Sequence, residues 1–149
     1  MKKFTLVLIA FLLLIPAITC GKEPGESPLS CQQCGMNRVT FAQSRMLIAY
    51  ADGSIVGTCS LHCAVADTKS QGGKTVRLLQ VADYNTKKLI DAKSAVWVIG
   101  GSKRGVMTSL PKWAFSKKKE AEEFVRQSGG KVTSFDEAVD MAENEQGRM

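Results

Sequence analysis

The sequence is poor in histidine, the side chain that most often serves as a general acid or base in enzymes. It contains a single histidine, His62, and this residue alone would have to serve any Ser-His-Asp arrangement. The stretch GGSKRG at 100–105 lacks the Gly-Lys-Ser/Thr ending of a phosphate-binding loop, so we interpret it as a surface loop. The sequence therefore predicts a protein that is not an enzyme.

A clustered basic surface is also missing. The formal net charge is +6, and two of these charges, Lys2 and Lys3, lie in the first few residues. The lysines at 117–119 are followed at once by Glu120 and two further glutamates, so positive charge is balanced locally. Nucleic-acid binding needs a clustered basic face with stacking aromatic residues. We therefore expect no nucleic-acid partner.

No apolar run is long enough for a lasting transmembrane helix, which needs about 20 residues. The run from Leu6 to Ile15 follows two lysines and precedes small residues that end at Cys20. This order is typical of a secretory signal, here residues 1–19. An anchor that is never cleaved is the alternative.

Cys20 stands where bacterial lipoproteins carry the cysteine that is lipidated and becomes the new N-terminus. The segment GKEPGESPLS at 21–30 is rich in Gly, Pro and Ser and has no apolar periodicity, so it predicts a flexible tether. We expect residues 20–30 to form a lipidated tether. The protein would then be exported and membrane-anchored, facing the periplasm or the cell exterior.

Residues 31–83 predict a first ββαβ unit. RMLIAY and IVGTC flank an Asp-Gly turn, which is a strong hairpin signal. SLHCAVADTKSQGG reads as a helix that stops at Gly72 and Gly73, because paired glycines favour a left-handed C-terminal cap. TVRLLQVADY then reads as a strand.

Residues 84–149 predict a second such unit with a C-terminal helix. AVWVIGG reads as a strand, 104–114 as a strand and loop, and SKKKEAEEFVRQSGG as a helix with Ser116 as its N-cap. KVTSF is a strand, and Ser134 with Glu137 forms a capping box for the last helix.

The two units are related by a repeat. QGGKTV at 71–76 and SGGKVT at 128–133 lie 57 residues apart, each at a helix-to-strand junction. Two copies are too few for a solenoid, so the predicted fold class is α+β with two small homologous units. At these matched positions only the first unit has soft ligands: Cys59, His62 and Cys63 correspond to Ser116, Lys119 and Glu120.

Four cysteines follow the tether in the pattern C-x2-C, 24 residues, C-x3-C. Cys31 and Cys34 sit on a turn that Gly35 helps to form, and Cys59 and Cys63 bracket the start of a helix. Residues four apart share a helix face, and the hairpin between the pairs can bring turn and helix together. Small zinc domains build four-thiolate sites in this way.

Three other interpretations fit the same cysteines. Exported proteins usually oxidise their thiols, so two structural disulfides are a serious alternative, and a purely structural zinc site is another. A thioredoxin-like redox role is weaker, because C-x-x-C there opens a helix and here precedes a hairpin.

The neighbours of the cysteines favour copper. Met36 follows Cys34 by two residues, His62 is adjacent to Cys63, and Met107 lies in a Gly-rich loop. Thiolate and thioether together are soft ligands that select Cu(I). The candidate metal ligands are therefore Cys31, Cys34, Met36, Cys59, His62, Cys63 and Met107.

The sequence also resembles the NosL-type copper lipoproteins, accessory factors for assembling nitrous oxide reductase. The likeness runs through CQQCGM, CSLHCAVAD, VADYNT, AVWVIGGS, GVM with KWAF, and EAEEFVRQSGGKV. It implies two homologous ββαβ units and one Cu(I) delivered to the copper centre of the reductase. By position it implies that Cys31 or Cys34, together with Met36 and Met107, belong to the copper site. CSLHC adds two thiols and a histidine where many members have fewer soft ligands.

Overall fold

The structure is a computed structural model that describes residues 28–147. The predicted signal peptide, Cys20 and most of the tether lie outside the described residues. Within residues 28–147, no helix is both long enough and apolar enough to cross a membrane.

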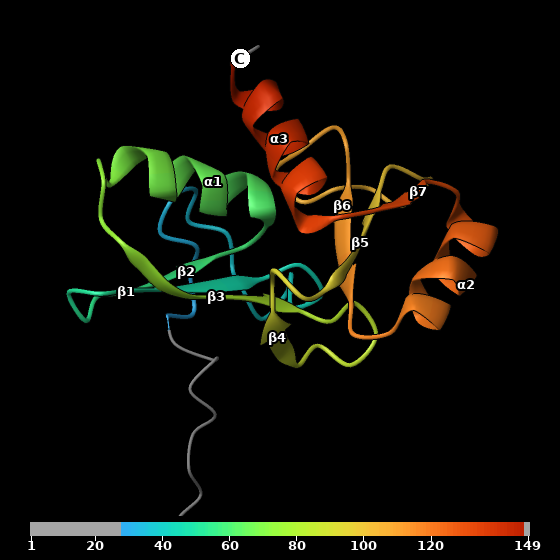
Figure 1. The fold of residues 1–149 in the computed structure, drawn as a ribbon, viewed down its shortest axis with the longest axis horizontal. Coiled ribbons are helices and arrows are strands. Elements are labelled where there is room, and N and C mark those ends of the chain that lie inside the picture. Colours follow the sequence, from blue (N-terminus) through green and yellow to red (C-terminus); the bar gives the residue numbers. More distant parts are fainter. Residues whose placement is uncertain (1–27, 148–149) are drawn as a thin grey trace, which may run out of the picture.

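A four-stranded antiparallel sheet forms the first half of the fold, with the strand order β2-β1-β3-β4. Helix α1, Leu61–Ser70, leaves the end of β2 and lies along one face of this sheet (Figure 1). The four strands are β1 Met46–Tyr50, β2 Ile55–Thr58, β3 Val76–Ala82 and β4 Leu89–Asp91.

The second half is a three-stranded antiparallel sheet with the order β6-β5-β7. Helix α2 flanks this sheet, and α3 packs against both α1 and β5, so it joins the two halves (Figure 1). These elements are β5 Val96–Ile99, β6 Lys112–Phe115, α2 Lys118–Ser128, β7 Lys131–Thr133 and α3 Phe135–Gln146. The predicted α+β fold with two ββαβ units is confirmed.

The offset of 57 residues seen in the Gly-Gly pairs also holds for the strand and the helix that precede each pair. It places the start of β2 on that of β6 and the start of α1 on that of α2. All four glycines of the two pairs have positive φ angles, a backbone region that glycine adopts without strain. The units differ in their hairpins, because the connection is 51–54 in the first and 100–111 in the second.

One predicted helix start is wrong. Helix α2 has Lys117 as its N-cap residue, and Ser116 lies before it. The backbone N–H of Ser116 instead donates to the Asp83 carboxylate, so this residue is part of the contact between the two halves. Ser134 does cap α3, since its hydroxyl accepts from the backbone N–H of Glu137.

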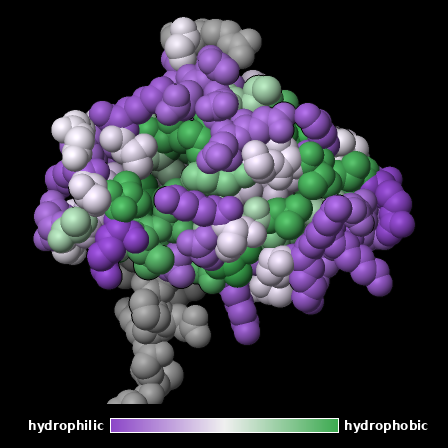
Figure 2. All heavy atoms as spheres, viewed as in Figure 1, coloured by the Kyte–Doolittle hydropathy of each residue, from purple (hydrophilic) through white to green (hydrophobic). Residues whose placement is uncertain are grey.

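Buried apolar side chains form two clusters. The first lies between the four-stranded sheet, α1 and α3. The second combines apolar side chains of the second unit with the cysteines of the first, and its rings of Tyr84, Trp113, Phe115 and Phe124 have centroids 4.9–6.4 Å apart. The cysteines are therefore part of the hydrophobic core. On the visible face, apolar side chains also reach the surface on α1 and on the sheet below it, among charged ones (Figure 2).

Asp83 connects the two halves. Its carboxylate is fully buried and accepts hydrogen bonds from the N–H and hydroxyl of Thr86, at 2.7 and 2.9 Å, and from the N–H of Ser116 at 2.7 Å. Burial alone would raise the pKa of Asp83, but these hydrogen bonds outweigh it and hold the pKa below its usual value. The carboxylate is therefore the form that the fold requires.

We predict that Asp83→Asn destabilises the protein. An amide nitrogen turned toward these N–H groups leaves donors unpaired, which costs about 1–3 kcal/mol at neutral pH. Because the folded pKa is depressed, the advantage of the carboxylate is fully present above about pH 4 and is lost as the pH falls through the folded pKa. Urea unfolding at neutral and acid pH measures both effects. The exposed Asp140→Asn is the control, and equal stability of the two variants at neutral pH would contradict the prediction.

Candidate metal centre

The four cysteines of the described chain meet at one point. Their Sγ atoms all lie within 4.8 Å of one another. Cys59 is central, with its Sγ 3.5 Å from that of Cys34 and 3.7 Å from that of Cys63. A tetrahedral ion with metal–sulfur bonds of about 2.3 Å sets its sulfurs about 3.8 Å apart. The thiols are therefore close to the spacing that a single ion requires.

Access to this cluster is uneven. Cys31, Cys59 and Cys63 are at most 2% exposed, whereas Cys34 is half-buried. None of the four forms a disulfide, since all are free thiols and a disulfide bond would need about 2.05 Å between sulfurs. The cluster is thus a closed set of ligands with one sulfur at its edge.

A tight turn presents the first pair of cysteines. The N–H of Cys31 donates to the carbonyl of Met36 at 2.8 Å, and the N–H of Gly35 donates to the carbonyl of Cys31 at the same distance. Gly35 has a φ of 76°, which favours glycine at this position. The backbone of the turn therefore places Cys31 and Cys34 on one short loop.

A buried arginine fixes this turn to the first sheet. Arg38 is 1% exposed, and its guanidinium donates to the carbonyls of Thr58 at 3.2 Å, Met46 at 2.9 Å and Pro28. A Cβ atom at Gly57 would lie 2.6 Å from the guanidinium, so only glycine leaves room for it. The sequence gives a weak signal of this contact, because a glycine inside a strand often marks a close approach.

Polar contacts also tie the turn to α1. Gln33, between the first two cysteines, donates to Asp67 at 2.9 Å, and Asp67 also accepts from the Tyr50 hydroxyl at 2.6 Å. The hydroxyl of Ser44 donates to the carbonyl of Cys59 at 2.7 Å. These supporting residues are not recognisable from the sequence, because nothing in their spacing marks them as partners.

The thiols titrate differently because they share hydrogen bonds. The hydrogen bond with Cys63 lowers the pKa of Cys59 to about 6, with further help from Cys34 and Cys31 and against the effect of burial. Burial raises the pKa of Cys34 to about 11, and the contact with Cys59 together with burial raises the pKa of Cys63. One thiolate is therefore stabilised by its neighbours, and further deprotonation calls for a cation.

The other predicted ligands take different positions. Met36 is partly buried and packs against the cluster that contains the cysteines. His62 is 8% exposed and does not belong to the group of four thiols. Its pKa is lowered by burial, and Glu145 and Lys112 are the charges that act on it, so its ring lies near α3 and β6. The structure therefore adds Met36 to the surroundings of the thiols and leaves His62 outside their cluster.

Met107 lies on the long loop of the second unit. It is 43% exposed, has a φ of 55°, and follows the buried Val106, which shares the cluster of the cysteines. Glu145 of α3 holds this loop by accepting from the Thr108 hydroxyl at 2.7 Å and the Leu110 N–H at 3.1 Å, and by pairing with Lys112 at 2.5 Å. The methionine is thus presented to solvent by a loop that is anchored on both sides of it.

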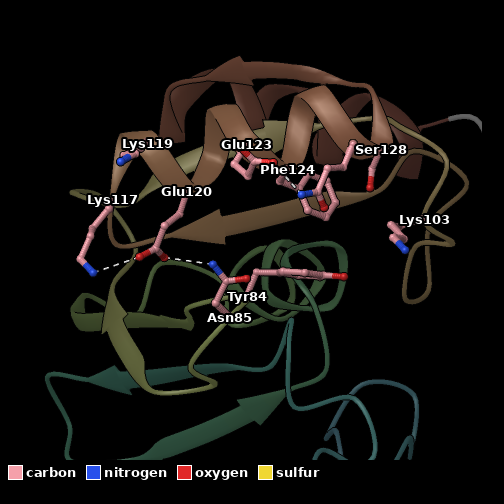
Figure 3. A pocket seen from close by; sticks show the side chains of 10 residues that line it. Tyr84, Asn85, Lys103, Lys117, Lys119, Glu120, Glu123, Phe124 and Ser128 are labelled. Atoms are coloured by element: carbon pink, nitrogen blue, oxygen red, sulfur yellow. Dashed lines mark hydrogen bonds and ion pairs between the residues drawn. The ribbon is translucent and has the colours of Figure 1, made fainter.

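A surface pocket of about 630 Å³ is a separate feature. Figure 3 shows Tyr84 and Asn85 facing α2 across it, with Glu120 bonded to Asn85 and Lys117. Its lining contains no cysteine, methionine or histidine. The pocket therefore plays no part in the thiol centre.

A closed cluster of four thiols on a two-sheet α+β scaffold is the arrangement of a candidate soft-metal-binding protein. The NosL family model matches residues 26–142, and the chain therefore belongs to the NosL family. The fold is similar to the crystal structure of the copper chaperone NosL from Shewanella denitrificans, with a TM-score of 0.62 and 25% sequence identity. That match covers 78% of this chain and 93% of the other. No curated protein matches the sequence.

We predict that Cys34 reacts first with an alkylating reagent in the folded, metal-free, reduced protein. It is the only one of the four thiols in the cluster that is not fully buried. The thiolate is the reactive form, so a pKa of about 11 makes the rate rise about tenfold per pH unit between about pH 7 and pH 10. Peptide mapping after brief labelling measures the order. Denatured protein is the control, and faster labelling of Cys59 would contradict the assignment.

Proposed function

We propose that the protein is a Cu(I) metallochaperone whose four clustered thiols hold the ion. The observation that carries this is the meeting of Cys31, Cys34, Cys59 and Cys63 within 4.8 Å. Among the common metals, thiolate ligands favour Cu(I) and zinc. Family membership and the similarity to a structure described as a copper chaperone support copper.

The protein acts as a carrier under this proposal, with the metal as its cargo. Three buried thiols keep the ion from water, and Cys34 at the edge offers a sulfur that an acceptor can approach. Met36 adds a thioether against the same cluster. A neutral thioether holds the ion less tightly than a further thiolate, which suits a donor that must release it.

We further propose that the recipient is an exported cuproenzyme, namely nitrous oxide reductase at its copper centre. The support is family membership together with the resemblance of CQQCGM and the later segments to NosL-type accessory proteins. The Cu(I)-loaded protein should raise the copper content of metal-free reductase, and the apo-protein with the same free copper should not. Transfer no faster than from a copper–glutathione complex would remove this recipient.

The competing function is structural. Four thiols within 4.8 Å of one another also suit zinc, and a unit held together by zinc would serve as an interaction module or handle another heavy metal. Cu(I) and zinc are distinguished by which one the reduced protein retains in competition.

We predict that the cysteines dominate Cu(I) affinity. In an anaerobic titration against a Cu(I) chelator, Cys59→Ser should weaken binding more than about 100-fold, since even residues that only orient ligands cost 10–100-fold. Met107→Leu keeps the bulk of the side chain and removes its sulfur. Because Met107 is exposed, the loss of Cu(I) affinity should stay below about tenfold. A wild type that retains zinc in the presence of equimolar Cu(I) would sink the copper proposal.

We also propose that the mature chain begins at a lipidated Cys20 and stays at a membrane facing the periplasm or the cell exterior. The motivation is the short signal-like run before Cys20 and the Gly-, Pro- and Ser-rich segment after it. Cys20→Ser should move the protein from the membrane to the soluble fraction. Cell fractionation and intact-mass analysis measure this change. Ser60→Ala, remote in sequence from the signal, is the control, and a Cys20→Ser protein that is processed and membrane-bound like the wild type would refute the anchor.

A further inference from the structure

We propose that the thiol cluster is a redox switch in which a small disulfide, such as oxidised glutathione, converts Cys34 and Cys59 to a disulfide and so expels the bound ion. The release step rests on the proposed function. The disulfide step rests on the geometry of the thiols alone.

The pairing follows from distance. The Sγ atoms of Cys34 and Cys59 are 3.5 Å apart, closer than the 3.7 Å between Cys59 and Cys63. A disulfide bond of about 2.05 Å requires the first pair to approach by about 1.5 Å. Cys34 lies on a turn and Cys59 at the end of β2, so a small shift of the turn brings the sulfurs together.

The order of events follows from burial. Cys34 is the half-buried sulfur through which a reagent enters, whereas Cys31, Cys59 and Cys63 are at most 2% exposed. Cys59 is in contact with Cys34 from inside the cluster. Cys34 is therefore the attacking thiol and Cys59 the resolving thiol.

The chemistry balances as two thiol–disulfide exchanges. The Cys34 thiolate attacks one sulfur of the small disulfide, which forms a mixed disulfide and releases one small thiolate. The Cys59 thiolate then attacks Cys34 Sγ and releases the second small thiolate. Two protein thiols are oxidised, the small disulfide is reduced to two thiols, and the two protein protons go to the released thiolates.

The consequence for the metal is direct. Thiolates bind soft metals, and a disulfide sulfur carries no negative charge. Oxidation therefore removes two of the four ligands and leaves only Cys31 and Cys63. The ion keeps its charge and leaves because its site has lost half of its thiolates. Exported proteins meet the oxidants that drive this step.

Tryptic peptides of this chain report the pairing. Cleavage after Lys22 and Arg38 gives peptide 23–38 with Cys31 and Cys34, and cleavage after Arg45 and Lys69 gives peptide 46–69 with Cys59 and Cys63. The full-length, metal-free, reduced protein is incubated with oxidised glutathione, free thiols are blocked, and the digest is analysed by mass spectrometry. We expect the two peptides joined, with Cys31 and Cys63 blocked. Loss of two hydrogens within either peptide would overturn the pairing.

Serine variants test the roles. Cys34→Ser should slow oxidation about tenfold or more, because the remaining thiols are buried. Ser102→Ala, at an exposed position outside the thiol cluster, is the control and should form the same cross-link at the wild-type rate. Equal rates in Cys34→Ser and wild type would overturn the assignment of the attacking thiol.

A copper-loaded arm tests the release. We expect Cu(I) to appear on a chromogenic chelator in step with the cross-link, and dithiothreitol to restore binding. A wild type that binds no Cu(I) but forms the cross-link would remove the proposed function and leave the disulfide step standing. A wild type that binds Cu(I) but keeps it after the cross-link forms would overturn the switch.

Discussion

The buried guanidinium of Arg38 is the contact on which the metal centre depends. It donates to carbonyls of the segment before the turn, of β1 and of β2, and it occupies the space left by the missing side chain of Gly57. A buried charge is tolerated only when its donors are satisfied, so the positions of these segments are mutually fixed. Cys31 and Cys34 reach Cys59 and Cys63 because these contacts hold the turn against the sheet. Gln33 and Asp67 then fix its orientation toward α1.

The two ββαβ units share one order of elements but carry different side chains at matched positions. The 57-residue offset relates Cys63 on α1 to Glu120 on α2 and His62 to Lys119. In the first unit both positions are buried, and Cys63 is one of the clustered thiols. In the second unit Lys119 and Glu120 line an open, charged pocket (Figure 3). The second unit instead contributes aromatic side chains that share a core with the cysteines, so it shields the centre without supplying a thiol.

The sequence predicted the turns and helix ends that depend only on residues close together in the chain. The Asp-Gly hairpin, the Gly-Gly helix ends and the Ser134 cap are short-range patterns, and the structure confirms them. The meeting of the cysteines followed from helix spacing and the hairpin between the pairs. The prediction that Ser116 caps α2 failed because its backbone N–H donates to Asp83, 33 residues away in the chain. Nothing in the sequence indicates that contact. Arg38, Gln33 and Glu145 have partners set by the packing of distant elements, and periodicity carries no information about such pairs.

The contacts between Glu145 and the loop of Met107 affect the order in which parts of the chain fold. All four thiols of the cluster come from residues 31–63, within one early stretch, whereas the loop of Met107 is fastened by the last turn of the last helix. Contacts between nearby residues form faster than those that close long loops. During synthesis from the N-terminus onward, the thiols can therefore gather while the C-terminal segment is still emerging. The loop of Met107 is held in place only once the final residues of α3 have arrived.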